Sequence, residues 1–562
     1  MHRIVKAHLN NFVKSCGYEL EDEADQFEMF SAHCVIASRF TSTFDMGDVK
    51  TGPGEDGIDG VAILIDEAVC SSEEDAESIF SAERRNHDVD VVFIQAKRSE
   101  TFDLGDFLKF KESILRFVNQ DQYQIQNDVL ANARKVFDVV VSQVPKIRNG
   151  KPSLTVRYVT TGLYREPGAL EIAIKDFETQ LNEFGLFYVI DIKFIDRDEL
   201  TKLWVETYSG IDASLSISSF AALPNIADID EAYLVVVSAK EFVKNLLTTS
   251  DGSLRTQVFE ENVRAFLGND NLVNKSIAET LQSTAKSRFP VLNNGITIVS
   301  PDVRVQGNTI HLKNFQIVNG CQTSNVLYEN QDCLDSVMVN LKIVETKNED
   351  VFSELVKATN SQSKVDDTQF LSLLPVSKRI EQFFNSFGEQ DKLYFERRDR
   401  QYAGLDVQAI KIYSLHNAAK CVAAMYCERP DLASRYPKRV YDELGAQIFA
   451  DDSKEILFYS ACFAMYKLTV LFSNGGIPQE LKKLKWHMLP LLRLMIVGNK
   501  KFQFSSKDAQ KSAQTILDAL TTDESLKKIA KKLTQVCRRF KDETSDRLKR
   551  QAILVEMIES IK

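Results

Sequence analysis

Two apolar segments of the sequence each carry, at one end, residues that could bind a metal ion and act on a phosphate. Residues 57–64 read Gly-Ile-Asp-Gly-Val-Ala-Ile-Leu, and residues 90–97 read Asp-Val-Val-Phe-Ile-Gln-Ala-Lys. Both have the β-branched, apolar character of a buried strand. Side chains alternate along a strand, so Gln95 and Lys97 are expected on one face. If Asp59 lies on the neighbouring strand, a carboxylate, an amide oxygen and an ammonium meet at one end of the sheet.

This combination suits metal-assisted hydrolysis of a phosphodiester. Oxygen ligands such as the Asp59 carboxylate and the Gln95 amide are those that Mg²⁺ or Mn²⁺ prefers, and Lys97 would stabilise developing charge or position the attacking water. Each residue also has a simpler explanation. Asp-Gly is a common turn pair, and Gln or Lys at a strand end can reach solvent without a function. The order of the three, each at a strand end, favours the metal site.

Composition is that of an ordinary globular protein. The chain has 562 residues, a length that predicts three or four structural units. Of these residues 44% are hydrophobic and 27% are charged, as in an ordinary globular protein. Its formal charge of −11 means that any nucleic-acid binding depends on local basic patches. We find no leader and no apolar run of about 20 residues, so we expect no membrane contact.

Several other classes of chemistry are not indicated. The nine cysteines are scattered without metal-binding spacing, which favours reduced thiols and a cytoplasmic location. None of the seven histidines lies in a catalytic-looking motif, and no phosphate-binding loop of the P-loop type occurs. The strand-end residues are therefore the strongest catalytic candidates.

The chain divides into three regions by pattern. Residues 1–207 alternate strands and helices and predict an α/β sheet, residues 208–425 mix short strands and helices as an α+β unit, and residues 426–562 are helical. In the first region, helices are expected at 21–39 and 103–117, and further strands at 137–141, 154–159 and 187–194. The acidic stretch 66–87 predicts a long hairpin tip or mobile loop.

The order Asp59, then Gln95-Ala96-Lys97, resembles the PD-(D/E)xK nuclease superfamily, in the variant where glutamine replaces the middle acid, as in Mrr-type restriction endonucleases. The resemblance implies a restriction-endonuclease-like mixed sheet flanked by helices, and a further carboxylate from the first helix. Glu28 is best placed for this role, although three other acidic residues lie nearby. Glu28, Asp59 and Gln95 would be the metal ligands, and a site with only two carboxylates should bind Mg²⁺ weakly without substrate phosphate.

Five blocks further along resemble the AIPR family, named for abortive infection and phage resistance. They cover residues 259–268, 289–299, 316–324, 358–365 and 394–398. The position after Asn-Gly that usually holds a second small residue is Cys321 here. Members of that family are associated with bacterial phage defence, and many look like fusions to a restriction-type nuclease domain. The resemblance therefore implies a bacterial defence protein of the same layout.

The AIPR-like blocks contain amides, hydroxyls and arginines that could read a nucleotide or nucleic acid. A helix over residues 322–327 would offer free amide hydrogens to a phosphate, and guanidinium groups match phosphate geometry. The candidates are Asn294, Asn319, Gln322, Thr323, Asn360, Gln362, Arg397 and Arg398. Turns, helix caps and a solvated arginine face explain the same residues without a ligand.

Near the C-terminus, residues 527–550 hold ten Lys/Arg and three acids. An apolar stripe at helical spacing runs through them, at Ile529, Leu533, Val536 and Phe540. The segment is therefore expected to form an amphipathic helix, whose basic side either grips phosphates or is only hydrated.

Two functions remain in view. The first is a Mg²⁺-dependent endonuclease that cuts DNA, or RNA, when a phage-derived or partner-protein trigger arrives, and that works as a homodimer or larger oligomer. The second is a binding module, in which the nuclease fold is inactive and the AIPR-like region binds a nucleotide, nucleic acid or protein. The Asp59 and Lys97 pair distinguishes them, because only the first function requires it.

Overall fold

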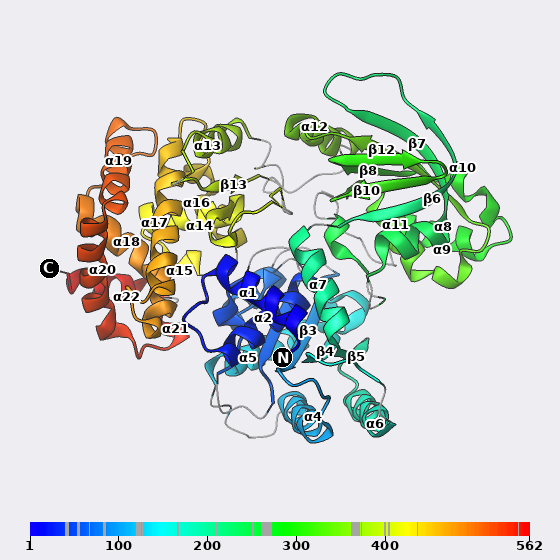
Figure 1. Cartoon of the computed structure of the whole chain (residues 1–562), viewed down its shortest axis with the longest axis horizontal. Coiled ribbons are helices and arrows are strands. Elements are labelled where there is room, and N and C mark those ends of the chain that lie inside the picture. Colours follow the sequence, from blue (N-terminus) through cyan, green and yellow to red (C-terminus); the bar gives the residue numbers. More distant parts are fainter. Residues whose placement is uncertain are drawn as a thin grey trace.

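The described part of the computed structural model contains a five-stranded sheet, a seven-stranded sheet and a helical region that includes a small two-stranded sheet (Figure 1). The structure describes the whole chain except residues 40–43, 53–56, 67, 82–85, 120–124, 126, 166–167, 210, 250–251, 253, 260–271, 361–370, 372–373, 390, 398–400, 403–404, 435–436, 549 and 562.

The first sheet has five strands in the order β2-β1-β3-β4-β5. They are β1 (Gly60–Ile65), β2 (Ala68–Val69), β3 (Val89–Lys97), β4 (Ser153–Thr160) and β5 (Ile190–Ile195). β1 runs antiparallel to β2 and β3, whereas β3, β4 and β5 are parallel. Every residue of β1 is buried, as the apolar run predicts for a strand covered on both faces. The predicted mixed sheet is confirmed.

Helices cover both faces of this sheet. α1 (Arg3–Cys16), α2 (Glu23–Ala37) and α7 (Arg197–Ser209) share one core with Ala62, Val92 and Ile94. α3 (Glu73–Ser81), α4 (Leu104–Asn119), α5 (Asp128–Ser142) and α6 (Gly168–Phe184) share another with Val61 and Phe93. The expected helices at 21–39 and 103–117 are therefore present.

Two expectations for this region were wrong. Residues 137–141 form no strand but the last part of α5, which begins at the Asn127 cap and buries Leu130, Phe137 and Val140 at helical spacing. The stretch 66–87 is not a simple loop: its described part contains β2 and α3, whose Ile79 enters the core. In both cases tertiary packing of an apolar helix face overrides the local pattern.

The second sheet has seven strands in the order β11-β8-β12-β7-β6-β10-β9. They are β6 (Ala213–Ala222), β7 (Glu231–Ser238), β8 (Ile296–Ser300), β9 (Asp302–Gln306), β10 (Thr309–Lys313), β11 (Gln316–Asn319) and β12 (Met338–Glu345). All pairings are antiparallel except β12 with β8. α8 (Ala239–Phe242), α9 (Leu272–Gln282), α10 (Phe289–Leu292) and α11 (Cys321–Glu329) share the core on one face, and α12 (Glu349–Asn360) packs on the other. This is the α+β unit that the pattern predicts.

The helical region forms one core that includes residues from Val376 to Met557, so the expected boundary at residue 425 falls inside it. Its helices are α13 (Pro375–Asn385), α14 (Leu415–Tyr426), α15 (Pro430–Ala433), α16 (Pro437–Ile448), α17 (Glu455–Ser473), α18 (Lys485–Val497), α19 (Lys507–Thr521), α20 (Asp523–Cys537), α21 (Ser545–Leu548) and α22 (Gln551–Glu559), with a small parallel sheet of β13 (Tyr394–Glu396) and β14 (Ile412–Ser414). α17 is long and apolar enough to cross a membrane, but 72% of that stretch is buried in this core, as in the central helix of a globular unit.

Both downstream regions contact the first region. From the helical region, the Ser473 hydroxyl donates to the Gly17 carbonyl at 2.8 Å, and Lys485 lies 3.5 Å from Asp45. The Lys485 ammonium lowers the pKa of the Asp45 carboxyl to about 2. From the second sheet, the side chain of Gln257 donates to the carbonyl of Ala37, the last residue of α2. Contacts from the helical region and from the second sheet thus fix the segments around α1 and α2, the helices next to the candidate site.

Candidate active site

Asp59 lies beside the end of β3 that carries Gln95 and Lys97. β1 pairs with β3 so that Gly60 faces Ile94, and the pairing continues to Asp59, whose backbone N–H donates to the Ile94 carbonyl at 2.9 Å. The Asp59 carboxylate in turn accepts a hydrogen bond of 2.8 Å from the backbone N–H of Ala96. One hydrogen bond from the Asp59 backbone and one to its side chain therefore position Asp59 at this end of β3.

The Gln95 side chain is buried and only partly satisfied. It is 1% exposed, and its Oε1 has no hydrogen-bond partner among the described residues. Leaving a buried acceptor unpaired costs about 1–3 kcal/mol. A Cβ atom at Gly57 would lie 2.9 Å from the Gln95 Nε2, so glycine at this position leaves room for the amide. A buried amide oxygen without a partner among the described residues is one of the groups that a bound cation could satisfy.

Glu28 contributes from α2, but it is already paired with a cation. The Lys50 ammonium lies 2.9 Å from the Glu28 carboxylate and 2.8 Å from that of Asp25. Lys50 reaches this point because its backbone forms an isolated antiparallel bridge with Gly60, the first residue of β1. No sequence motif indicated Lys50, since its proximity depends on a bridge that a single sequence does not reveal.

The charges of the site act on one another. Burial raises the pKa of the Asp59 carboxyl to about 6, the Ala96 hydrogen bond opposes this rise, the Glu28 charge adds to it, and the ammonium groups of Lys97 and Lys50 oppose it. Burial alone would lower the pKa of Lys50, but its hydrogen bonds to two carboxylates raise it overall. The structure thus brings the charged members of the predicted set into electrostatic contact and adds Lys50.

The residue types of this set suit a hard divalent cation, but Gln95 lies on the Phe93 face of the sheet whereas α2, which carries Glu28, packs on the Ile94 face. Within the described ranges, no three His, Cys, Asp or Glu side chains lie together as a metal site. Glu28 and Asp59 supply two carboxylates, and Gln95 supplies the unpaired oxygen. All three are oxygen ligands of the kind that Mg²⁺ and Mn²⁺ take. Lys50 holds the Glu28 carboxylate, so a metal ion would compete with its ammonium.

The candidate binding residues in the AIPR-like blocks lie on several different elements. Asn319, at the end of β11, donates to the Thr359 carbonyl on α12 at 2.7 Å, and Gln322 is buried and accepts from Asn274 at 2.9 Å. Thr323 is half-buried in the first turn of α11, and Asn294 is exposed. The predicted helix is present: α11 begins at Cys321, one residue before the expected start, and Gly320 separates it from β11.

Arg397, one of the two arginines that were expected to bind a phosphate, has a protein partner. Arg397 donates to the Glu381 carboxylate at 2.7 Å, and its side chain is 7% exposed. Its position therefore indicates a structural ion pair. Gln362 and Arg398 lie outside the described residues, as does the side chain of Asn360.

Comparison with known proteins gives one match. The model of a family described as AIPR protein matches residues 259–552. Searches among curated proteins and among solved structures found no match. The matched range begins within the second-sheet region and extends through the helical region, farther than the blocks that carried the resemblance in the sequence. The first sheet and its strand-end site lie outside it.

Proposed function

The chain belongs to the AIPR family, a family of abortive-infection defence against phage, and we propose that it protects its host as a nuclease. In this proposal the first sheet is a PD-(D/E)xK-type catalytic domain that cleaves phosphodiester bonds in DNA, or RNA, with the help of Mg²⁺. The AIPR-matched part controls or directs it.

One observation carries the proposal: the buried Oε1 of Gln95 has no hydrogen-bond partner among the described residues, and Gln95 directly precedes Ala96, whose N–H holds the Asp59 carboxylate. A polar strand end that merely reached solvent would be exposed and hydrated, whereas Gln95 is 1% exposed. Retaining an unsatisfied oxygen there is destabilising unless a ligand completes it. A bound ion, a water molecule or a catalytic role can each explain such a group, and the first is what the proposal assigns to Gln95.

The residues divide the chemistry among them. Asp59, Gln95 and Glu28 would hold the Mg²⁺ ion, which when bound polarises the phosphate and lowers the pKa of water. Lys97, on the same strand as Gln95, would hold the negative charge that develops on the phosphate oxygens. Asp59 is oriented for its part by the Ala96 N–H, and Glu28 becomes available when Lys50 releases it.

The test is cleavage by the purified full-length protein. Supercoiled plasmid and single-stranded RNA are incubated with Mg²⁺ or with EDTA, using wild type, Asp59→Asn and Lys97→Ala. We expect Mg²⁺-dependent cleavage that falls by about 100-fold or more in both variants, as for loss of one transition-state contact. Lys175→Ala, an exposed lysine on α6, is the matched control. Equal cleavage by wild type and both variants would exclude this site.

A binding module remains the second candidate, favoured by the ion pair that occupies Glu28. Phage plating separates the two. If protection survives Asp59→Asn and Lys97→Ala but is lost in Asn294→Ala, the AIPR part acts by binding and the nuclease proposal fails. Asn294 suits this comparison because it is exposed, so its substitution should not disturb the core.

A further inference from the structure

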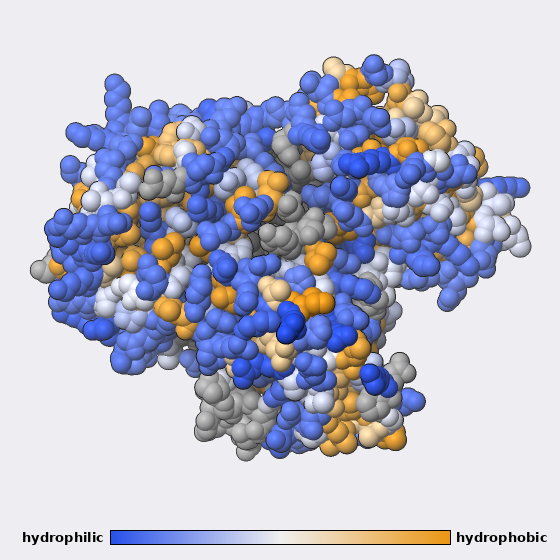
Figure 2. Space-filling view, in the orientation of Figure 1, coloured by the Kyte–Doolittle hydropathy of each residue, from blue (hydrophilic) through white to orange (hydrophobic). Residues whose placement is uncertain are grey.

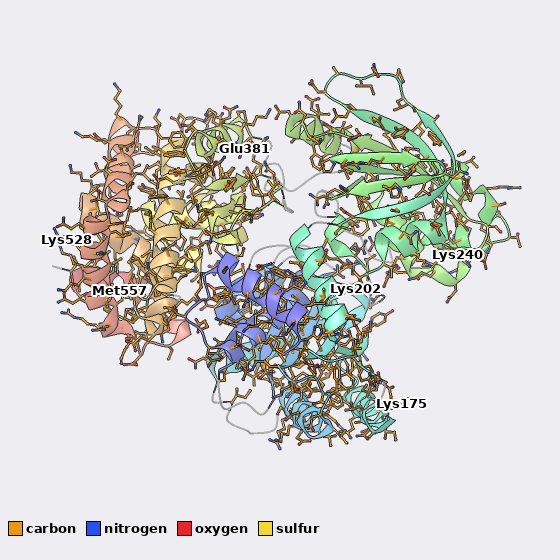
Figure 3. The ribbon with its side chains drawn as sticks, in the orientation of Figure 1. Lys175, Lys202, Lys240, Glu381, Lys528 and Met557 are labelled. Atoms are coloured by element: carbon orange, nitrogen blue, oxygen red, sulfur yellow. The ribbon has the colours of Figure 1, made fainter. Side chains whose placement is uncertain are left out.

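The outer side of α20 and the turn that follows it is strongly basic. Six of its Lys and Arg side chains are exposed and have no ion pair or hydrogen bond with any described residue. We call them the α20 basic face: Lys527, Lys531, Lys532, Arg538, Arg539 and Lys541. In Figure 3, the neighbouring Lys528 marks this side at the outer edge of the molecule, and Figure 2 shows a hydrophilic surface there.

Packing explains why the helix is there, but not why its outer side is basic. Ile529, Leu533 and Val536 are buried in the core of the helical region, so the helix is amphipathic as predicted. No Asp or Glu occurs between residues 525 and 541, in a chain with 80 acidic and 69 basic residues. Exposed helices usually balance such charges at i and i+4.

The like charges on this face weaken the helix. Lys527 and Lys531 are four residues apart, as are Lys528 and Lys532, and like-charge pairs at this spacing cost about 0.2–0.5 kcal/mol each. Of these four, only Lys528 has an acidic partner among the described residues, Glu524 at 2.8 Å. A polyanion that lies along the helix would remove the repulsion.

We propose that the α20 basic face binds the phosphate backbone of a nucleic acid. From residue 527 to 541 the helix and turn extend roughly 20 Å, which matches about six phosphates of one strand along a duplex. Uniform positive charge without base-reading geometry favours backbone contact over sequence recognition. The choice of nucleic acid rests on the proposed nuclease function, for which this face would be a second contact to the substrate.

The composition of the α20 basic face argues against binding to a lipid surface. Helices that bind membranes present large apolar side chains beside their basic ones. Among the described residues between 406 and 554, no large hydrophobic side chain is exposed, and the apolar side of α20 lies in the core. The face therefore offers charge alone.

The face lies on the opposite side of the helical region from the first sheet (Figure 1), but the two are physically connected. The segment Gln479–Leu484 packs against α20, and its Lys482 lies 3.5 Å from Glu21, just before α2. A nucleic acid bound to α20 would thus lie on a helix whose neighbouring segment, Gln479–Leu484, contacts Glu21 just before the helix that carries Glu28.

Binding is measured by fluorescence anisotropy of a labelled 30-base-pair duplex with the full-length protein in EDTA, so that no cleavage occurs. Lys527→Ala/Lys531→Ala should bind more weakly, and the slope of log affinity against log salt should fall by about 1.8, or 0.9 per lost contact. Lys532→Ala/Arg539→Ala is a second pair on the same face and should act alike. The control is Lys175→Ala/Lys202→Ala, two exposed lysines elsewhere (Figure 3).

Unchanged affinity and salt slope in both α20 variants would overturn the proposal. So would a loss of binding to phosphatidylglycerol vesicles in these variants while DNA binding persisted, since that would assign the face to a membrane. If wild type does not cleave DNA or RNA in the separate assay with Mg²⁺, but the α20 variants bind the duplex more weakly in EDTA, the nuclease proposal fails while the α20 basic face stands.

Discussion

The charge of Asp59 should destabilise the first region, so removing it should stabilise the protein. Burial holds the pKa of this carboxyl at about 6, against 3.8 for an ordinary aspartate. Asp59→Asn removes the charge and keeps an oxygen that can accept the Ala96 N–H. The variant should therefore be more stable than wild type at neutral pH, although it lacks a proposed metal ligand.

The magnitude follows from linkage. Between about pH 4 and 6 the folded protein keeps a proton that the unfolded chain has released, so the stability contributed by Asp59 falls as the pH rises through this window. Above pH 6 the full difference of roughly 2 pKa units applies, or about 3 kcal/mol at 1.36 kcal/mol per unit. At pH 4.5 the same relation leaves about 1 kcal/mol. The advantage of Asp59→Asn should thus be large at pH 8 and small at pH 4.5.

The two tryptophans allow unfolding of the first region to be followed separately from unfolding of the helical region. Trp204 is buried in the core of the first region, and Trp486 lies in the helical region. In a Trp486→Phe background, emission reports unfolding of the first region, which is followed in urea with EDTA present. A gain of about 3 kcal/mol would also raise the melting temperature by roughly 2–4 °C per kcal/mol for a unit of this size.

Asp191 supplies a control of opposite sign. Burial would raise its pKa, but the Arg157 ion pair and other cations lower it overall. Asp191→Asn should therefore destabilise the protein at pH 8, with a loss that shrinks in acid. If Asp59→Asn were less stable than wild type at pH 8, or its effect did not change with pH, the account of Asp59 would be refuted.

Three further predictions concern single positions. Lys50→Met should tighten Mg²⁺ binding about tenfold, as measured by calorimetry. The reason is that it removes an ammonium 2.9 Å from the Glu28 carboxylate, whose attraction in high dielectric is worth roughly 1.4 kcal/mol. Unchanged affinity would show that Lys50 does not compete with the metal ion. Arg397→Ala should lower stability by about 3 kcal/mol, because Glu381 loses its ion-pair partner and keeps the neutral hydrogen bond from Gln401, and the additional change Glu381→Gln should recover part of the loss. Gly295→Ala should cost more than about 1 kcal/mol in thermal unfolding, since Gly295 has φ of 81° and a Cβ there would meet a backbone oxygen of β12 at 2.9 Å.

The strand-end residues were predictable because their signal is local. The apolar runs that become β1 and β3 are continuous, and alternation along β3 alone determines that Gln95 shares the face of Phe93. Asp59 needed only the pairing of two neighbouring strands. The family resemblance was equally accessible, because its blocks lie in order along the chain and the family match covers them.

The rest depended on contacts between distant segments. Residues 137–141 look like a strand, but Phe137 and Val140 belong to a helix whose other buried positions begin at Leu130. Lys50 enters the site through one backbone bridge to Gly60, and Arg397 meets Glu381, sixteen residues away along the chain. Local patterns do not reveal which charges are already paired in the fold.

These long-range contacts also show how the AIPR-matched part can influence a site that it does not contain. Lys485 pairs with Asp45, and the Asp45 side chain accepts a hydrogen bond from Gly47 in the short turn that leads directly to Lys50. Lys50 in turn holds the carboxylate of Glu28. Each link is an ion pair, a hydrogen bond or a few residues of backbone, so a shift of the helical region would act on the availability of one proposed metal ligand. Control of the proposed nuclease would require such a connection, and this one uses Lys50, a residue outside the motif that first indicated the site.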